Sequence, residues 1–170
     1  MNKFFWVTVI TVLSIVLVSC SKDSNQQELN TLDGVWQLTA WNVEGGMDMN
    51  KDGVAHTNIL DEISCTNNET LVFDASGVVL FNNTFNPKIK ITAINNLLEN
   101  LSTNVVCDSG VIGSATSYTV DGNKVILGST IAIINGNEID IIRKDKLKVF
   151  NPDMSTVIVT QDVMEVYTKI

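Results

Sequence analysis

One loop of this 170-residue chain, residues 48–54 (DMNKDGV), has the residue types and spacing best suited to a chemical task. Side-chain oxygens recur at every second position, on Asp48, Asn50 and Asp52. A calcium ion takes about six to eight oxygen ligands, and a glycine at the sixth loop position permits the sharp turn that gathers them. The backbone carbonyl of Val54 would supply one more oxygen. The spacing therefore predicts a Ca²⁺ site in this loop.

The pattern resembles the calcium loops of EF-hands and of extracellular repeats such as dockerins, with a departure at the twelfth position. That position normally carries a bidentate carboxylate, and here it is Ile59. Asp61 and Glu62 follow two and three residues later, so a stretched loop would use one of them. His56, at the ninth position, would act only through a water molecule. The alternative is an Asp- and Asn-rich turn that holds no ion.

Residues for enzymatic catalysis are scarce. His56 is the only histidine of the chain, and no Gly-X-Ser-X-Gly, HEXXH or CXXC motif accompanies it. Arg143, the only arginine, lies in the charged run 142–146 and is interpreted as part of a turn or bulge rather than as a ligand anchor. We therefore expect a protein that is not an enzyme and needs no cofactor other than the candidate Ca²⁺ ion.

An apolar stretch over residues 4–18, with Lys3 before it, has the form of a secretory signal peptide. As a helix it would span about 22 Å, short of the roughly 30 Å hydrocarbon core that a transmembrane anchor must cross. Its ending, residues 17–20 (LVSC), resembles a bacterial lipobox. The resemblance implies cleavage before Cys20 and attachment of lipid to that residue, which would anchor the protein to a membrane.

These features divide the chain into three parts. Residues 1–19 are the expected signal peptide, the polar residues 20–32 a flexible tether, and residues 33–170 a single domain. Lys22 and Asp23 resemble the start of the surface-export signals of Bacteroidetes-type lipoproteins. The resemblance implies an outer-membrane lipoprotein that faces either the periplasm or the cell surface.

The net charge and the other two cysteines further limit the kind of protein that this chain can be. Without residues 1–19 the chain has 10 basic and 19 acidic residues, so it would repel nucleic acids. With Cys20 used by lipid, Cys65 and Cys107 remain. An exported chain meets an oxidising compartment, which favours a disulfide between them, worth roughly 4 kcal/mol in the chain-entropy model. A metal-binding or catalytic thiol is the alternative, but no second soft ligand accompanies either cysteine.

Alternating apolar and polar residues between short turns predict an all-β domain. Residues 35–41 alternate so that Trp36 and Trp41 are expected on opposite faces. Tight turns join sequential strands, which must then run antiparallel, and eight to ten such strands favour closure into a barrel. The expected strands after the first are 70–73, 78–81, 118–120, 124–127, 131–134, 138–142, 146–150, 157–160 and 163–169.

One segment departs from the β pattern. Ile94, Leu97, Leu98 and Leu101 have the spacing of one helix face. We expect a short helix near 94–102, either packed on the barrel or forming a lid over a ligand mouth. The alternative is a strand over residues 88–94 with a loose loop after it.

The first strand also carries a family resemblance. Gly34-Val35-Trp36 resembles the Gly-X-Trp signature of lipocalins, and residues 71–77, 117–125 and 165–169 fit the small lipocalin-like domains of Bacteroidetes-type lipoproteins. The resemblance implies an up-and-down barrel with Trp36 packed at its closed end and a small hydrophobic ligand in its mouth. The candidates to line that mouth, or to fill a solid core instead, are Val125, Ile131, Ile133, Ile139 and Ile141.

A second function is compatible with the same features. The domain would be a structural or interaction module of a cell-envelope or cell-surface assembly, and loops such as 44–64 would make the contacts. The lipid on Cys20 would then serve only to hold the module at the membrane.

Overall fold

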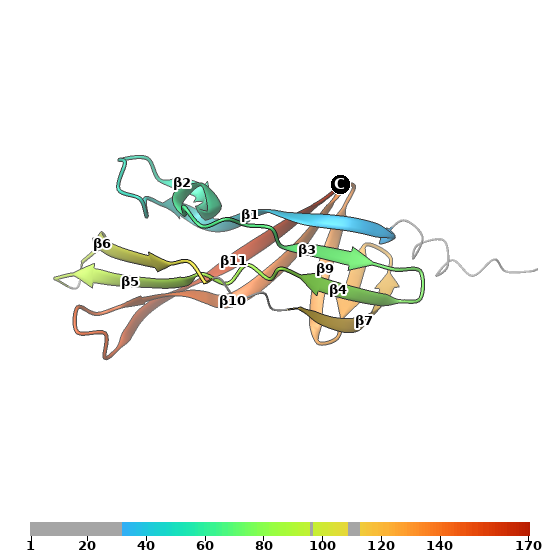
Figure 1. Cartoon of the computed structure of the whole chain (residues 1–170). Helices are drawn as coiled ribbons and strands as arrows, with labels where there is room; N and C mark the ends of the chain where they lie inside the picture. The colour runs from blue at the N-terminus through green and yellow to red at the C-terminus, as the bar shows by residue number, and fades with distance from the viewer. Residues whose placement is uncertain (1–31, 96, 109–112) are drawn as a thin grey trace, which may run out of the picture.

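The computed structural model describes residues 32–95, 97–108 and 113–170, which form a closed antiparallel β-barrel of eight strands (Figure 1). The strand order is β11-β1-β3-β4-β7-β8-β9-β10, and β10 pairs with β11 to close the barrel. The predicted all-β, up-and-down, lipocalin-like architecture is confirmed. The strands of the barrel are β1 (Gly34–Met47), β3 (Thr70–Phe73), β4 (Val78–Asn82), β7 (Ser114–Asp121), β8 (Lys124–Leu127), β9 (Thr130–Asn135), β10 (Glu138–Phe150) and β11 (Val157–Lys169).

Tight turns produce the meander, as the sequence predicts. Gly122 and Gly136 have φ values of 60° and 64°, which glycine adopts at little cost, and they connect β7 to β8 and β9 to β10. The predicted signal peptide and Cys20 lie outside the described residues, as does the tether except for its last residue. In the part of the chain that the structure covers, no helix is long and apolar enough to cross a membrane.

The last two strands are longer than expected. Residues 138–150 form the single strand β10 and residues 157–169 the single strand β11, where four strands were predicted. The pairing register shifts between Arg143 and Leu147, and Asp145 has a positive φ of 51°. This bulge absorbs the charged run without ending the strand. The interpretation of Arg143 as part of a turn or bulge is thus confirmed for the backbone.

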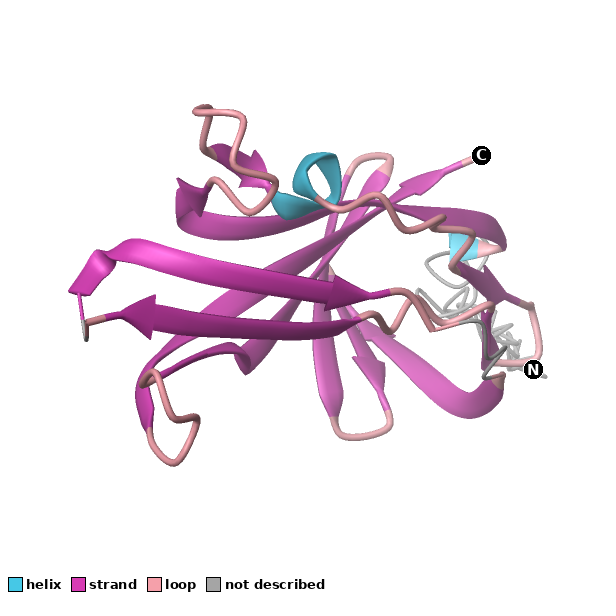
Figure 2. Ribbon diagram, turned by 60° about the vertical axis from the view of Figure 1, so that its left-hand side comes forward, coloured by secondary structure: helices cyan, strands magenta, loops and turns pink. Residues whose placement is uncertain are grey.

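Three arms project beyond the barrel at one end (Figures 1 and 2). The first is the end of β1 with its partner β2 (His56–Asn58), followed by the short 3₁₀ helix η1 (Ile59–Glu62). The second is the hairpin of β5 (Lys88–Ile94) and β6 (Leu97–Val106), and the third is the far half of the β10–β11 hairpin. β5 joins the barrel through a short parallel pairing with β10.

The predicted helix near 94–102 is wrong; of the alternative, the strand over 88–94 is confirmed, whereas the loose loop expected after it is wrong because β6 follows. Ile94 and Leu97 are cross-strand partners on either side of a turn at Asn95, which has a φ of 54°. Leu101 lies opposite Ala93. The helix-like spacing of the apolar residues therefore comes from two strands that face each other across a hairpin.

The closed end of the barrel is filled with side chains. Trp36 is 1% exposed, donates its indole N–H to the carbonyl of Leu32 at 2.8 Å, and meets Phe73 edge-on. This is the place that the lipocalin resemblance implies for Trp36. The prediction that Trp41 faces the opposite side is wrong, because a register shift between Leu38 and Ala40 turns it into the barrel as well.

Candidate functional site

An open pocket of about 410 Å³ lies inside the barrel, toward the arms. Trp36 pairs with Lys169 and Trp41 pairs with Glu165, so the level of Glu165 is several residues further from the closed end. Two aromatic side chains and several polar or ionisable groups line it, and polar groups of this kind fix the orientation of a ligand in small-molecule sites. The residues that line it are Glu69, Phe81, Thr84, Phe85, Asn86, Ser114, Arg143, Lys146 and Glu165.

A network of buried polar groups forms the floor of this pocket. The hydroxyl of Tyr167 donates to Glu69 Oε1 and the amide of Phe85 donates to Glu69 Oε2, both at 2.7 Å. Arg143 Nε donates to Glu165 Oε2 at 2.8 Å. Glu69 and Glu165 are each only 5% exposed. Buried carboxylates persist in folded proteins when they are paired in this way.

Burial changes the acid–base properties of the floor. It raises the pKa of Glu69 and outweighs the opposing hydrogen bonds from Tyr167 and Phe85. It also raises the pKa of Tyr167, with Glu165 and Glu69 adding to the effect, so that this hydroxyl stays protonated. Burial disfavours the charged form of Arg143, yet Glu165 reverses this and raises the pKa of Arg143. Titratable groups shifted by burial and specific partners are a common mark of binding sites.

A second pocket of about 340 Å³ adjoins the first, and Asn86 and Lys146 line both. Trp41 is its most buried wall, at 1% exposure, and stands edge-on to Phe85 with 5.1 Å between the ring centroids. The ammonium of Lys146 lies 5.1 Å from the centroid of the Trp41 ring. The indole N–H of Trp41 is buried and has no hydrogen-bond partner within the described ranges. The two adjoining pockets are called the mouth site below.

The residues expected to line the mouth lie elsewhere. Val125, Ile139 and Ile141 are fully buried in the filled core. Ile131 is 59% exposed and shares the outer face with Ile133, since the residue between them, Ala132, faces inward. The expectation is therefore wrong for these two. The acids of the mouth site were missed, although the alternation of Val163, Glu165 and Tyr167 on β11 places an acid in an inward position.

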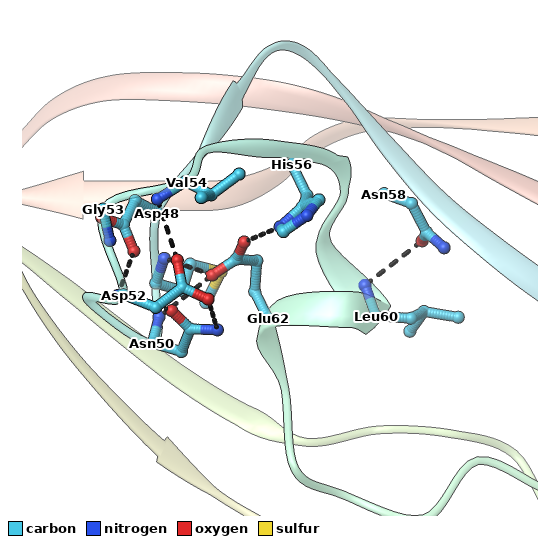
Figure 3. Close-up of polar contacts among 10 residues, drawn as sticks. Asp48, Asn50, Asp52, Gly53, Val54, His56, Asn58, Leu60 and Glu62 are labelled. Carbon is cyan, nitrogen blue, oxygen red and sulfur yellow. Dashed lines mark hydrogen bonds and ion pairs between the residues drawn. The ribbon is translucent and has the colours of Figure 1, made fainter.

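The predicted calcium loop brings its three side chains together (Figure 3). The carboxylate of Asp48 accepts from the amides of Asp52 and Gly53, at 3.1 and 3.0 Å. Asn50 also accepts from the amide of Asp52 and donates to its carboxylate, at 2.9 and 3.1 Å. Asp52 accepts from the amide of Val54 at 2.8 Å. The oxygens at the predicted positions thus order an exposed loop by hydrogen bonds to its own backbone.

Glu62 holds the base of this loop. Its Oε2 accepts from the amides of Met49 and Asn50, at 2.9 and 3.1 Å, and its Oε1 pairs with Nδ1 of His56. The hydrogen bond to Glu62 is the main cause that raises the pKa of His56. Burial acts to raise the pKa of Glu62, but His56 and the two amides outweigh it and lower the value.

The other candidate ligand, Asp61, is exposed, whereas Ile59 at the twelfth position is fully buried in the core. This explains why an apolar residue occupies that position. Within residues 32–95, 97–108 and 113–170, no group of three or more His, Cys, Asp or Glu side chains is arranged to hold a metal ion. Calcium binding by the loop stays a prediction.

The predicted disulfide between Cys65 and Cys107 is confirmed, with a Cα–Cα distance of 5.4 Å. It links the segment before β3 to the residue that follows β6. The β5–β6 arm is therefore covalently fixed at its base.

The sequence matches no protein-family model, and neither a curated protein nor a solved structure matches the chain. The class of protein is accordingly defined by the fold alone: a closed antiparallel β-barrel of eight strands, compatible with a lipocalin-like binding module.

Proposed function

We propose that this protein is a lipid-anchored, lipocalin-like binding module that holds a small hydrophobic ligand in its mouth site. The carrying observation is that two adjoining pockets, of about 410 and 340 Å³, lie beyond a filled closed end. Both sizes fall in the range of about 300–1,000 Å³ that small-molecule sites occupy. Apolar side chains form much of the walls: Phe81, Phe85, Ile89 and Phe150.

The anchor is proposed from the sequence. Cleavage before Cys20 and lipid on its thiol and amine would place the protein in the outer membrane, with residues 20–32 as tether. Leu32 contacts Trp36 at the closed end, so a tether would join the barrel at that end. A lipid-modified Cys20 in the mass spectrum of the mature N-terminal peptide is expected. Protease treatment of intact cells then decides which side of the membrane the barrel faces.

Ligand binding is tested by native mass spectrometry of the protein purified from cells, where a co-purifying small hydrophobe is expected. A second test uses displacement of a fluorescent fatty acid by the full-length chain. Ser114→Trp would fill the pocket and abolish binding, because Ser114 lines it. Ser117→Trp is the matched control on the outer face of the same strand. An empty barrel, or equal binding by both variants, contradicts the proposal.

We also propose that the loop at 48–54 binds Ca²⁺ and thereby stiffens the β1–β2 arm. The support is the convergence of Asp48, Asn50 and Asp52 within one exposed loop. Extracellular sites need affinities of only about 10⁻⁴ to 10⁻³ M. Calorimetry with millimolar Ca²⁺ should give heat for the native chain and none for Asp48→Asn. If the native chain gives neither heat nor a shift in melting temperature with millimolar Ca²⁺, the proposed calcium binding is contradicted.

An interaction module is the second candidate, and one observation favours it. All three arms carry exposed apolar side chains toward their tips, an arrangement typical of protein contact surfaces when the side chains gather in a patch. Cross-linking in intact cells should then capture a partner through the arms, and Ile158→Asp should weaken the capture. The exposed side chains are Val54, Ile94, Leu97, Met154, Val157 and Ile158.

A further inference from the structure

The outer edge of β6 has no strand beside it in the described part of the chain. β6 stands at the end of the strand order, and its one partner there is β5. Leu101 to Val106 pair with Ala93 to Lys88 without a register shift, so this part of the strand is regular. Residues 101–106 therefore present a row of backbone N–H and C=O groups, about 20 Å long, along the free edge.

The sequence of β6 does little to prevent another strand from pairing with this edge. Lysine, proline and bulges are the usual protection of free edges. β6 contains no lysine and no proline, its one charged residue is Glu99, and its single register shift lies at the tip of the hairpin. Ala93 on β5 is 1% exposed, whereas its β6 partner Leu101 is only half-buried. The inner face of this sheet therefore loses its cover at β6.

An open pocket of about 550 Å³ lies beside the edge and is called the trough below. Residues of all three arms line it, and Figure 2 shows the β5–β6 hairpin between the other two arms. Side chains of an added strand would alternate between two faces, and those on the inner face would enter the trough beside Leu101. The apolar residues that line the trough are Met47, Ala55, Ile94, Leu101, Val149 and Val159.

Charge indicates which kind of segment would pair with the edge. The first arm, over residues 44–62, has five acidic residues and one lysine, and Glu44, Asp52 and Asp61 are exposed. The whole chain has a net charge of −8, so a second copy would be repelled, whereas a basic segment would be attracted.

We propose that the free edge of β6 binds an extended segment of a partner protein, in which apolar residues alternate with lysine or arginine. The segment adds to the sheet as a strand, so backbone hydrogen bonds give affinity and the trough selects apolar side chains at every second position. The basic side chains are attracted by the acids of the first arm. This inference rests on the second candidate function, an interaction module, and does not require a ligand in the mouth site.

The test compares three synthetic peptides by calorimetry on the full-length protein. In the first, valine alternates with lysine; in the second, valine alternates with glutamate; the third has the composition of the first with its valines grouped together. The first is expected to bind at least about tenfold more tightly than the others. It should also slow hydrogen exchange at every second amide of residues 101–106, because strand addition occupies only the amides of the free edge.

Equal binding of the three peptides, no binding by the first, or binding without protection of β6 overturns the inference. A dimer of the chain that Leu101→Asp dissociates, measured by ultracentrifugation, also overturns it, because a second copy would then occupy the edge. If the peptides fail but cross-linking still captures a partner through the arms, only this inference is overturned, and the interaction module stands.

Two variants of β6 assign the binding to this edge. Leu101→Asp puts a carboxylate in the trough and should weaken binding of the first peptide at least about tenfold, because apolar side chains lose their contact there. Asn104→Asp adds the same charge at an exposed position of the same strand and should not weaken binding. Leu101→Ala, a milder change, should weaken binding several-fold. An unchanged melting temperature shows that a variant is folded, and equal binding by the two aspartate variants overturns the assignment.

Discussion

The two tryptophans of β1 mark the two ends of the barrel and have almost the same surroundings. Trp36 and Trp41 are each 1% exposed. Each has a phenylalanine edge-on to its ring and a lysine ammonium 5.1 to 5.3 Å from its ring centroid. The neighbours are Phe73 and Lys169 at the closed end, and Phe85 and Lys146 at the mouth.

The difference between them is one hydrogen bond. The indole N–H of Trp36 donates to the carbonyl of Leu32 at 2.8 Å, whereas that of Trp41 has no partner in the described residues. A buried donor left without an acceptor costs about 1–3 kcal/mol. The closed end is thus arranged for stability, while the mouth tolerates a local penalty, and such departures from good packing rules are expected where a protein acts.

The largest effect is expected from removing the disulfide. Replacing Cys65 and Cys107 with alanine should lower the free energy of unfolding by about 2–5 kcal/mol, because the unfolded chain regains the freedom that the link removes. Hydrogen exchange should show that the backbone amides of β5 and β6 lose protection first, while those of β1 around Trp36 stay protected. An equal loss of amide protection at both ends of the barrel would mean that the two ends unfold as one unit. The difference in stability between the closed end and the mouth would then be contradicted.

The tryptophan comparison itself is tested by Trp36→Phe and Trp41→Phe. Both lose similar volume, but only the first loses a hydrogen bond, so Trp36→Phe should be about 1 kcal/mol more destabilising in urea unfolding. Equal destabilisation without ligand would show that the N–H of Trp41 has an acceptor in solution.

Two neighbouring glycines in the first arm, at the end of β1, are expected to differ in how well they tolerate alanine. Gly45 and Gly46 both have positive φ values, 77° and 70°, so alanine is strained at either position. A Cβ on Gly46 would lie 3.0 Å from the carbonyl oxygen of His56, whereas a Cβ on Gly45 meets nothing within 4 Å. Gly46→Ala should therefore cost roughly 1 kcal/mol more than Gly45→Ala. Hydrogen exchange of β2 gives the local readout, and similar protection in the two variants would contradict the argument.

The smallest effect is a pH dependence confined to the same arm. His56 has a raised pKa, so its contribution to stability is complete below its ordinary value of 6.5 and is lost as pH rises through the raised value. Glu62 has a lowered pKa, so its contribution is complete above its ordinary value of 4.5 and is lost as pH falls through the lowered value. Thermal unfolding should show the pair's full contribution between pH 4.5 and 6.5. His56→Gln should flatten the profile, and an unchanged profile would rule the pair out as its source.

Sequence patterns predicted the local parts of this fold well. Thr70–Phe73 and Lys124–Leu127 were predicted with the bounds that the structure has, since alternation and the turns beside them are local signals. The disulfide followed from the export signal and the cysteine count. The antiparallel pairing of strands joined by short turns, such as β3–β4 and β7–β8, followed from those turns. The pairs β1–β3 and β4–β7 are joined by the long segments 48–69 and 83–113, and no turn signal predicted them.

The predictions that were wrong concern features set by contacts between residues far apart in the sequence. The face of Trp41 is set by a bulge between Leu38 and Ala40 opposite β11, and no local pattern marks it. The spacing of Ile94 and Leu97 suits a helix and a tight hairpin equally, and pairing of the two strands decides between them. Arg143 was placed in a bulge correctly, but its contact with Glu165 required the register of two long strands.

The β5–β6 arm has a consequence for how such a protein can change over time. The chain leaves the barrel after β4 and re-enters it at β7, and Phe81 nevertheless pairs directly with Ser114. A short turn in place of residues 83–113 would leave every wall strand beside its present neighbour. The pairing of the wall strands thus does not depend on the arm, so its outer part can be lengthened or exchanged as long as the buried residues Phe85 and Ile91 are kept. Diversity in what is recognised can then arise without redesign of the scaffold.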